Sequence, residues 1–216
     1  MLQHFGHQHW WPGDTPFEVC VGAILTQNTN WGNVERAIAN LKSAGVLEPV
    51  RLYGLAEADL AELIRPAGYF NVKARRLRSF RRVLVEDHGG NLESLMGSDT
   101  AATRRRLLAI HGIGEETADS MLLYAGGHCS FVIDAYTRRI FLRHGWSEAE
   151  ASYGDLQQTI EAGLREKPDT LNYWQDYHAQ VVMVGKHFCR PRNPDCAACP
   201  LKPLLPASGP PGHLVA

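Results

Sequence analysis

The chain has 216 residues, of which 44% are hydrophobic, so it can bury a substantial core, and wholesale disorder is excluded. No apolar run is long enough to cross a bilayer, and the first residues lack the basic start and apolar stretch of a secretory signal, so we expect a cytoplasmic protein. The formal net charge of −1 argues against binding of nucleic acid through bulk positive charge.

The pattern of apolar residues predicts helices along nearly the whole chain. Apolar side chains recur at spacings of three and four, and the period of two that is typical of strands is almost absent. Gly, Pro, Asn or Asp punctuate the joins. The predicted helical segments are 17–25, 33–41, 57–64, 74–85, 104–110, 117–125, 136–142, 155–164 and 174–186. The sequence therefore predicts an all-α fold with short connections.

Basic residues gather in three groups despite the near-neutral total charge. A solvated helix face is the ordinary role of any one such group. Three groups around a single turn motif favour contacts with nucleic acid. The groups are Lys73, Arg75, Arg76, Arg78, Arg81 and Arg82; Arg104, Arg105 and Arg106; and Arg138, Arg139 and Arg143.

Two predicted helices are joined at residues 111–114, His-Gly-Ile-Gly. Gly112 and Gly114 let the backbone turn sharply and approach another surface closely, while Ile113 is expected to fix the turn to the core. Backbone amides and the positive end of the second helix suit a phosphate oxygen. An ordinary tight helical hairpin without a ligand is the alternative.

An aspartate follows the second of these helices after an apolar stretch. Asp134 directly follows the apolar residues 131–133 and precedes a predicted helix. Aspartate commonly serves as an N-cap at such a position. From residue 108 to residue 139, however, the sequence resembles the helix-hairpin-helix with trailing aspartate of the endonuclease III superfamily of DNA glycosylases. The likeness extends over nearly the whole chain, and it implies that Asp134 is catalytic.

The resemblance also implies a fold and a mode of DNA binding. It implies two helical lobes, one a bundle of residues 18–128 with the hairpin, the other formed by residues 1–17 and 129–216 with a cysteine loop near the C-terminus. The hairpin of Gly112, Ile113 and Gly114 would bind a DNA phosphate, often through a monovalent cation. We expect DNA across the groove between the lobes.

A lysine that strand-cutting members of this superfamily use is missing. In those members it stands two residues beyond the second hairpin glycine, attacks the sugar and forms a Schiff base. Here that position is Glu116, and a carboxylate cannot form an imine. The resemblance therefore implies a monofunctional glycosylase, in which water attacks the sugar. Glu115 and Glu116 also put negative charge near the expected phosphate, which weakens DNA binding unless they point away.

Two short segments resemble the family's loops that flip a nucleotide out of the duplex. In LTQNTNW, at 25–31, Gln27 would help fill the hole that the nucleotide leaves. In GYFNVKA, at 68–74, Tyr69 would be the wedge that stacks on the orphaned base, and Lys73 is expected to contact DNA. Helix capping and core packing are the competing roles for both segments.

Three tryptophans are relevant to the question of which damaged base the protein recognises. Trp10 and Trp11 are followed by Pro12, and such a pair is most often a core anchor. Together with Trp31, however, they resemble a narrower branch, the endonuclease III-type 3-methyladenine DNA glycosylases. There, aromatic residues sandwich the flipped base and a lysine, here Lys186, lies beside it. A methylated purine is cationic, so aromatic faces hold it well, and it already leaves easily.

Three cysteines crowd the C-terminal region, which in a cytosolic protein indicates a metal more than disulfides. Cys189, Cys196 and Cys199 resemble the family's loop around a 4Fe-4S cluster, but its fourth cysteine is replaced by Leu205. We favour a 4Fe-4S cluster whose fourth ligand is unknown. A three-iron cluster, a lost cluster, and zinc with His187 as the fourth ligand are the alternatives.

The resemblance thus implies a monomeric DNA glycosylase of base excision repair that acts on double-stranded DNA containing a damaged base, and we expect this base to be an alkylated purine. Two alternatives stay open. One is an enzyme for oxidised pyrimidines with weak or no strand cleavage. The other is a non-catalytic DNA-binding relative.

Overall fold

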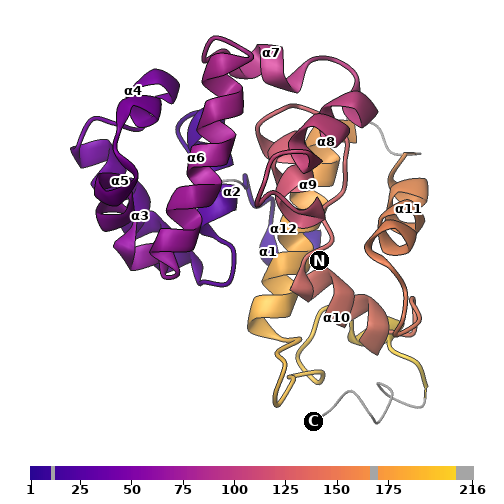
Figure 1. Ribbon diagram of the computed structural model, residues 1–216. Helices are drawn as coiled ribbons and strands as arrows, with labels where there is room; N and C mark the ends of the chain where they lie inside the picture. Colours follow the sequence, from indigo (N-terminus) through magenta and orange to yellow (C-terminus); the bar gives the residue numbers. More distant parts are fainter. Residues whose placement is uncertain (11–12, 166–169, 208–216) are drawn as a thin grey trace. The chain divides into compact units, whose positions relative to one another are not determined.

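The computed structural model describes residues 1–10, 13–165 and 170–207. Within these ranges every regular element is a helix and no strand occurs, as the all-α prediction expected (Figure 1). None of the described helices is both long and apolar enough to cross a membrane. The chain divides into two compact units, residues 11–130 and residues 1–10 with 131–216. The sequence had placed these divisions at 18–128 and at 1–17 with 129–216.

The unit of residues 11–130 is built around a fully buried helix. Every residue of α2 after its first is buried, because the segment is apolar on nearly all sides. α2 packs against α3, α6 and α9 (Figure 1). The elements are α2 (Pro16–Leu25), α3 (Trp31–Ser43), α4 (Pro49–Gly54), α5 (Glu57–Leu63), η1 (Arg65–Ala67), α6 (Phe70–Glu86), α7 (Leu92–Met96), α8 (Thr100–Leu108) and α9 (Glu115–Tyr124).

The other unit joins the start of the chain to its last third. Its elements are α1 (Leu2–Phe5), α10 (Ala135–Arg143), α11 (Tyr153–Leu164), α12 (Thr170–His187) and η2 (Lys202–Leu204). α12 packs against α10 and α1. The N-terminal segment is tied to α12 because Gln8 N donates to Asp176 Oδ1 at 2.7 Å and Gln180 Nε2 donates to the Gly6 carbonyl at 2.6 Å. Trp10 therefore belongs with α12.

Candidate functional site

The hairpin between α8 and α9 has two glycines with different constraints. Gly112 has φ +91, and a Cβ there would stand 2.9 Å from Cδ of Arg76, so both the backbone and the packing require glycine. Gly114 has an ordinary negative φ, and a Cβ there would meet nothing within 4 Å. Ile113 is buried in the core of its unit. The turn is thus fixed from inside and open at Gly114, where a ligand can reach the backbone.

Gln27 ties the loop after α2 to this hairpin. Its Nε2 donates to the Gly112 carbonyl at 3.1 Å and to Thr117 Oγ1 at 2.9 Å. Its Oε1 accepts from Arg76 Nη1. With both ends of the amide engaged, Gln27 sets the position of the hairpin relative to α6. The observed role of Gln27 is thus structural, and its role beside a flipped nucleotide stays a prediction.

Tyr69 is held out to solvent in a strained backbone. It immediately precedes α6 in the left-handed region, with φ 45 and ψ 33, which is costly for a residue with a Cβ. The residue is 71% exposed, an unusual state for a large aromatic side chain. An exposed ring on a constrained turn has the form that a wedge requires.

Lys73, in contrast, is part of the interior. It is 1% exposed, and its ammonium donates to the carbonyls of Leu25 at 2.8 Å and Ala67 at 2.7 Å. Burial, and to a lesser degree Arg76, lowers its pKa to about 8. Contact with DNA would require this side chain to leave both carbonyls. We therefore correct the expectation for Lys73, which joins the start of α6 to the end of α2.

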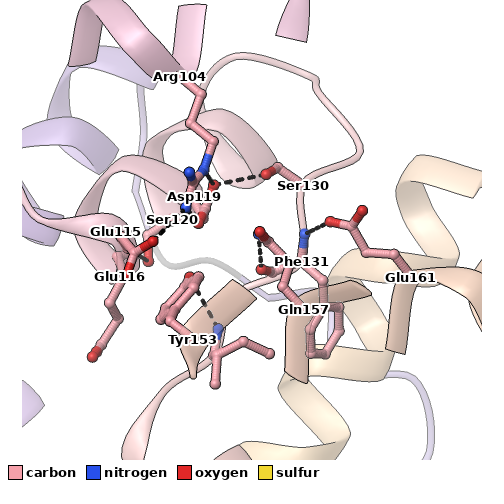
Figure 2. Close-up of polar contacts among 11 residues, drawn as sticks. Arg104, Glu115, Glu116, Asp119, Ser120, Ser130, Phe131, Tyr153, Gln157 and Glu161 are labelled. Carbon is pink, nitrogen blue, oxygen red and sulfur yellow. Dashed lines mark hydrogen bonds and ion pairs between the residues drawn. The ribbon is translucent and has the colours of Figure 1, made fainter. Parts of the chain in front are cut away.

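A buried carboxylate joins the two helices of the hairpin. Asp119 on α9 is fully buried and accepts from Arg104 on α8, at 2.8 Å from Nε and 3.0 Å from Nη2 (Figure 2). Ser130 Oγ donates to the same carboxylate at 2.7 Å. Arg104 also lies 3.4 Å from Glu115 Oε1. The charge of Glu115 is thus partly neutralised within the hairpin, which reduces its expected repulsion of a phosphate.

Glu116 stands in the first turn of α9 and is exposed. Its carboxylate occupies the position at which the resemblance described above implies a lysine in strand-cutting relatives. The backbone carbonyl of Glu116 accepts from Ser120 Oγ at 2.7 Å, which leaves the side chain outside that bond.

In the other unit, Asp134 uses its two oxygens differently. It is the N-cap of α10, and its Oδ1 accepts from the Thr137 amide at 2.7 Å, so the expected capping role is present. Oδ2 lies 3.8 Å from Nε2 of His178, and the carboxylate side chain is 13% exposed. Burial lowers the pKa of His178, while Asp134 acts in the opposite direction. One oxygen therefore fixes the side chain and the other is not used by the cap.

Side chains of α11 hold the extended segment that leads to Asp134 (Figure 2). The Phe131 amide donates to Glu161 Oε1 at 2.9 Å, and Gln157 Nε2 donates to the Phe131 carbonyl at 2.8 Å. The Ile133 amide donates to the Tyr153 hydroxyl at 3.2 Å. These three α11 residues escaped the sequence analysis because nothing in their spacing marks them. They form hydrogen bonds with backbone groups of residues 131 and 133, which are extended but pair with no strand in the described part of the chain.

The residues expected around the base are distributed over both units. Trp10 is half-buried in the unit of α12, and Trp11 lies outside the described residues. Lys186 is exposed near the end of α12. The preceding Gly185 packs so closely on Tyr136 that a Cβ would stand 2.7 Å from Cγ of its ring. Lys186 thus follows a residue in contact with the first turn of α10, which Asp134 begins.

Trp31 opens α3 and lines a pocket with carboxylates in its wall. Its Nε1 donates to Glu35 Oε1 at 2.9 Å. Glu18, also in the wall, pairs with Lys42 at 2.8 Å, and Lys42 pairs with Asp14 at the same distance. Among the charged residues of the wall, two carboxylates, Glu18 and Glu35, stand against one ammonium group, Lys42. The lining residues are Glu18, Gly22, Trp31, Glu35, Ile38, Ala39 and Lys42.

The cysteine loop surrounds a pocket of its own, lined by Cys189, Cys196, Cys199 and Leu205 among others. Burial raises the pKa of the Cys199 thiol, and the neighbouring Cys189 and Cys196 add to the rise. Three soft sulfur donors around one pocket suit an iron–sulfur cluster. In the described residues, no three His, Cys, Asp or Glu side chains already converge closely enough to hold a metal ion. His187 does not line this pocket.

Comparison with known proteins gives a consistent picture. Residues 21–166 match the model of the family described as HhH-GPD superfamily base excision DNA repair protein. A protein of Methanocaldococcus jannaschii named "Putative DNA repair glycosylase MJ1434" is 47% identical over 203 residues, which are 94% of this chain and 90% of the relative. Endonuclease III of Thermotoga maritima is 29% identical over 187 residues, 87% of this chain and 81% of that protein.

A solved structure is similar as well. It is the 3-methyladenine DNA glycosylase MagIII of H. pylori bound to 1,N6-ethenoadenine, with a TM-score of 0.74 and 31% identity. The likeness covers 82% of this chain and 87% of that one. The all-helical architecture, the hairpin and the capping aspartate thus occur together with sequence likeness over most of the chain.

Proposed function

The chain belongs to the HhH-GPD superfamily of base excision DNA repair proteins and is a DNA glycosylase of that superfamily, within which we propose that it hydrolyses the bond between deoxyribose and an alkylated purine without cutting the strand. The observation that carries the proposal is Glu116. It places a carboxylate in the exposed first turn of α9, where strand cleavage needs an amine. Water is then the nucleophile.

Asp134 is the proposed catalytic group. Its Oδ1 is engaged with the Thr137 amide, which orients the carboxylate, and Oδ2 remains for chemistry. Burial lowers the pKa of His178, which disfavours a positive imidazolium that would offset the negative charge of the Asp134 carboxylate. That charge stabilises the oxocarbenium-like sugar as the base departs, and the oxygen orients the attacking water.

The aromatic residues and their charged neighbours support an alkylated purine as the substrate. Methylation at N3 or N7 makes a purine cationic, and an indole beside carboxylates holds a cation better than a neutral ring. Trp31 with Glu18 and Glu35 offers such a surface. A cationic base also leaves without help from a strong acid, so one carboxylate is enough. Trp10, Trp11 and Lys186 are proposed to complete the recognition of the base.

Binding of double-stranded DNA is proposed to rest on the hairpin and on Tyr69. The open backbone at Gly114, at the start of α9, receives a phosphate, directly or through a monovalent cation. Tyr69 enters the duplex at the lesion, and Gln27 follows it. We propose that a monomer carries all of these groups.

The cysteine loop is proposed to hold a 4Fe-4S cluster through Cys189, Cys196 and Cys199. When bound, the cluster orders the loop rather than taking part in base release. The loop residues Arg190 and Arg192 are then presented to DNA phosphates.

Duplexes with an alkylated purine or with thymine glycol, and two substitutions of Asp134, test the proposal. Wild-type protein should release 3-methyladenine or 7-methylguanine, and strands should break only after alkali. Asp134→Asn should lower single-turnover release at least about a hundredfold while DNA binding persists. Its amide oxygen still accepts from Thr137, so the melting temperature should stay within about one degree of wild type, whereas Asp134→Ala should cost about 1 kcal/mol through loss of the cap.

Each other result points elsewhere. Release of thymine glycol alone would identify an enzyme for oxidised pyrimidines. DNA binding without release of any base would identify a non-catalytic relative. Strand breaks without alkali, together with a complex trapped by borohydride, would contradict the assignment based on Glu116.

A further inference from the structure

The pocket of the three cysteines contains a further donor that the sequence motif does not reveal. Besides Cys189, Cys196 and Cys199, it is lined by His144, the C-cap of α10, and by Asp195, whose Oδ1 already accepts from the Ala198 amide at 3.2 Å. Leu205, at the position of the family's fourth cysteine, lines the same pocket. His144 is far from the cysteines in sequence, so its place beside them comes only from the fold. His144 therefore brings a nitrogen donor to a pocket whose loop has leucine in place of the family's fourth cysteine.

The hydrogen bonds of His144 define which nitrogen is available. Its Nδ1 lies 2.8 Å from the Ile140 carbonyl, and because a carbonyl only accepts, Nδ1 carries the hydrogen. In the neutral ring Nε2 then bears a lone pair. The residue is 6% exposed, and Nε2 has no hydrogen-bond partner within the described part of the chain. A buried polar atom without a partner is costly, so it requires an explanation.

The surroundings of His144 fix the ring as metal-ligating histidines are commonly fixed. Such histidines donate their other ring N–H to a backbone carbonyl, as Nδ1 does here. Trp146 covers the ring at 4.5 Å between centroids. Arg143, the preceding residue, holds the loop by donating to the carbonyls of Arg190 at 2.6 Å and Pro191 at 2.9 Å. The end of α10 is therefore already joined to the cysteine loop.

We propose that Nε2 of His144 is the fourth ligand of the 4Fe-4S cluster, completing a set with Cys189, Cys196 and Cys199. The four donors line one pocket without converging on a single metal ion, and a 4Fe-4S cluster requires no such convergence, because each of its ligands binds a different iron. Nε2 gives its lone pair to iron without losing a proton. Replacing a thiolate by a neutral imidazole removes one negative charge, so the cluster should have a higher potential than a four-cysteine cluster.

Anaerobically purified protein tests the proposal without any measurement of base release. Wild type should contain iron and acid-labile sulfide at about four each per chain. Pulsed EPR of the reduced cluster should show a nitrogen coupling that changes when histidine is labelled with 15N. His144→Leu should lose most of the iron or retain a three-iron cluster. His144→Leu with Leu205→Cys should recover the four-iron cluster without the nitrogen coupling.

The double variant also separates loss of the ligand from misfolding, because a chain that refolds around a restored cysteine is intact. His187→Leu is the matched control: this exposed histidine lies two residues before Cys189 but does not line the pocket, so the cluster should persist. The proposal is overturned if wild type contains no iron, if it contains zinc alone or a three-iron cluster, or if His144→Leu retains the four-iron cluster with its nitrogen coupling.

Discussion

At the scale of single residues, Asp134 is the most instructive side chain, because a capping role and a proposed catalytic role are usually treated as alternative interpretations of one aspartate. Its Oδ1 caps α10 through the Thr137 amide at 2.7 Å, while Oδ2 faces His178 at 3.8 Å. The cap fixes the rotamer and thereby aims the second oxygen. The two roles are thus compatible, and a helix N-terminus provides a rigid mount for a catalytic carboxylate.

The two hairpin glycines allow folding and DNA contact to be separated. Gly112→Ala forces a Cβ into φ +91 and against Arg76, so it should lower stability by about 1–2 kcal/mol and weaken DNA binding. Gly114→Ala has room and an ordinary φ, so it should melt as wild type does. If a phosphate meets the backbone there, the added methyl should nonetheless weaken DNA binding several-fold. Melting curves and fluorescence anisotropy with a lesion duplex measure both effects.

The outcome at Gly114 is the sharper test. If Gly114→Ala binds DNA with wild-type affinity, the proposed contact between the hairpin backbone and DNA is contradicted. Wild-type stability in Gly112→Ala would mean that the turn readily adopts another conformation.

Lys73 shows where residue-by-residue interpretation of a sequence fails. It stands beside a run of arginines, and composition alone suggests a solvated, DNA-facing group. The burial of its ammonium group depends on the carbonyls of Leu25 and Ala67, which the fold brings together from two separate segments. His144 is a similar case, since its carbonyl partner is local but the cysteines beside it are remote in sequence.

At the scale of elements, α11 supports the segment that leads to the proposed catalytic Asp134 through hydrogen bonds to residues 131 and 133. Tyr153→Phe removes the acceptor for the Ile133 amide, immediately before Asp134, and leaves it without its partner at 3.2 Å. We expect single-turnover base release to fall about tenfold, with lesion-DNA affinity unchanged, because positioning and not binding is lost. Rapid-quench kinetics and anisotropy give the two quantities.

Tyr53→Phe is the control for that variant. The Tyr53 hydroxyl also forms a hydrogen bond, in this case by donating to Glu86 at 2.7 Å, but Tyr53 is 38% exposed and lies in the unit of residues 11–130. It should behave as wild type. The positioning role of α11 would be contradicted if both variants lost the same fraction of the base-release rate. It would also be contradicted if Tyr153→Phe lowered the affinity for lesion DNA and not the rate.

The elements themselves were largely predictable, for identifiable reasons. α6 and α3 carry their apolar residues on one face, so spacing reveals them. α2 is apolar throughout, and its location in the centre of its unit follows. α1, α4 and α7 have 4, 6 and 5 residues, too few to show a period, and the sequence did not predict them. The hairpin and Asp134 were predictable because their spacing is local, whereas the α11 contacts and His144 depend on tertiary packing.

At the scale of the whole molecule, the net charge of −1 raises the question of how the protein binds a polyanion. The three basic groups of the sequence contain twelve positively charged side chains, which would all be available for phosphates if they were exposed. Most of these side chains, however, form hydrogen bonds inside the protein, to backbone carbonyls, carboxylates or the Gln27 amide. The engaged residues are Lys73, Arg76, Arg78, Arg81, Arg104, Arg106, Arg138, Arg139 and Arg143.

Arg75, Arg82 and Arg105 are the members of the groups that are exposed and whose side chains form no hydrogen bond in the described ranges. Each phosphate neutralised by a cation contributes about −0.9 to the slope of log Kobs against log salt. Twelve contacts would give a slope of about −11, whereas these three together with the proposed contacts of Arg190 and Arg192 would give about −4.5. We expect a slope near the smaller value for undamaged duplex, measured by anisotropy between 50 and 300 mM salt, and a shallower slope when Arg75, Arg82 and Arg105 are all changed to Ala. A slope steeper than about −8 would mean that the internal arginines release their partners on DNA, and that the near-neutral protein reorganises its charges to bind.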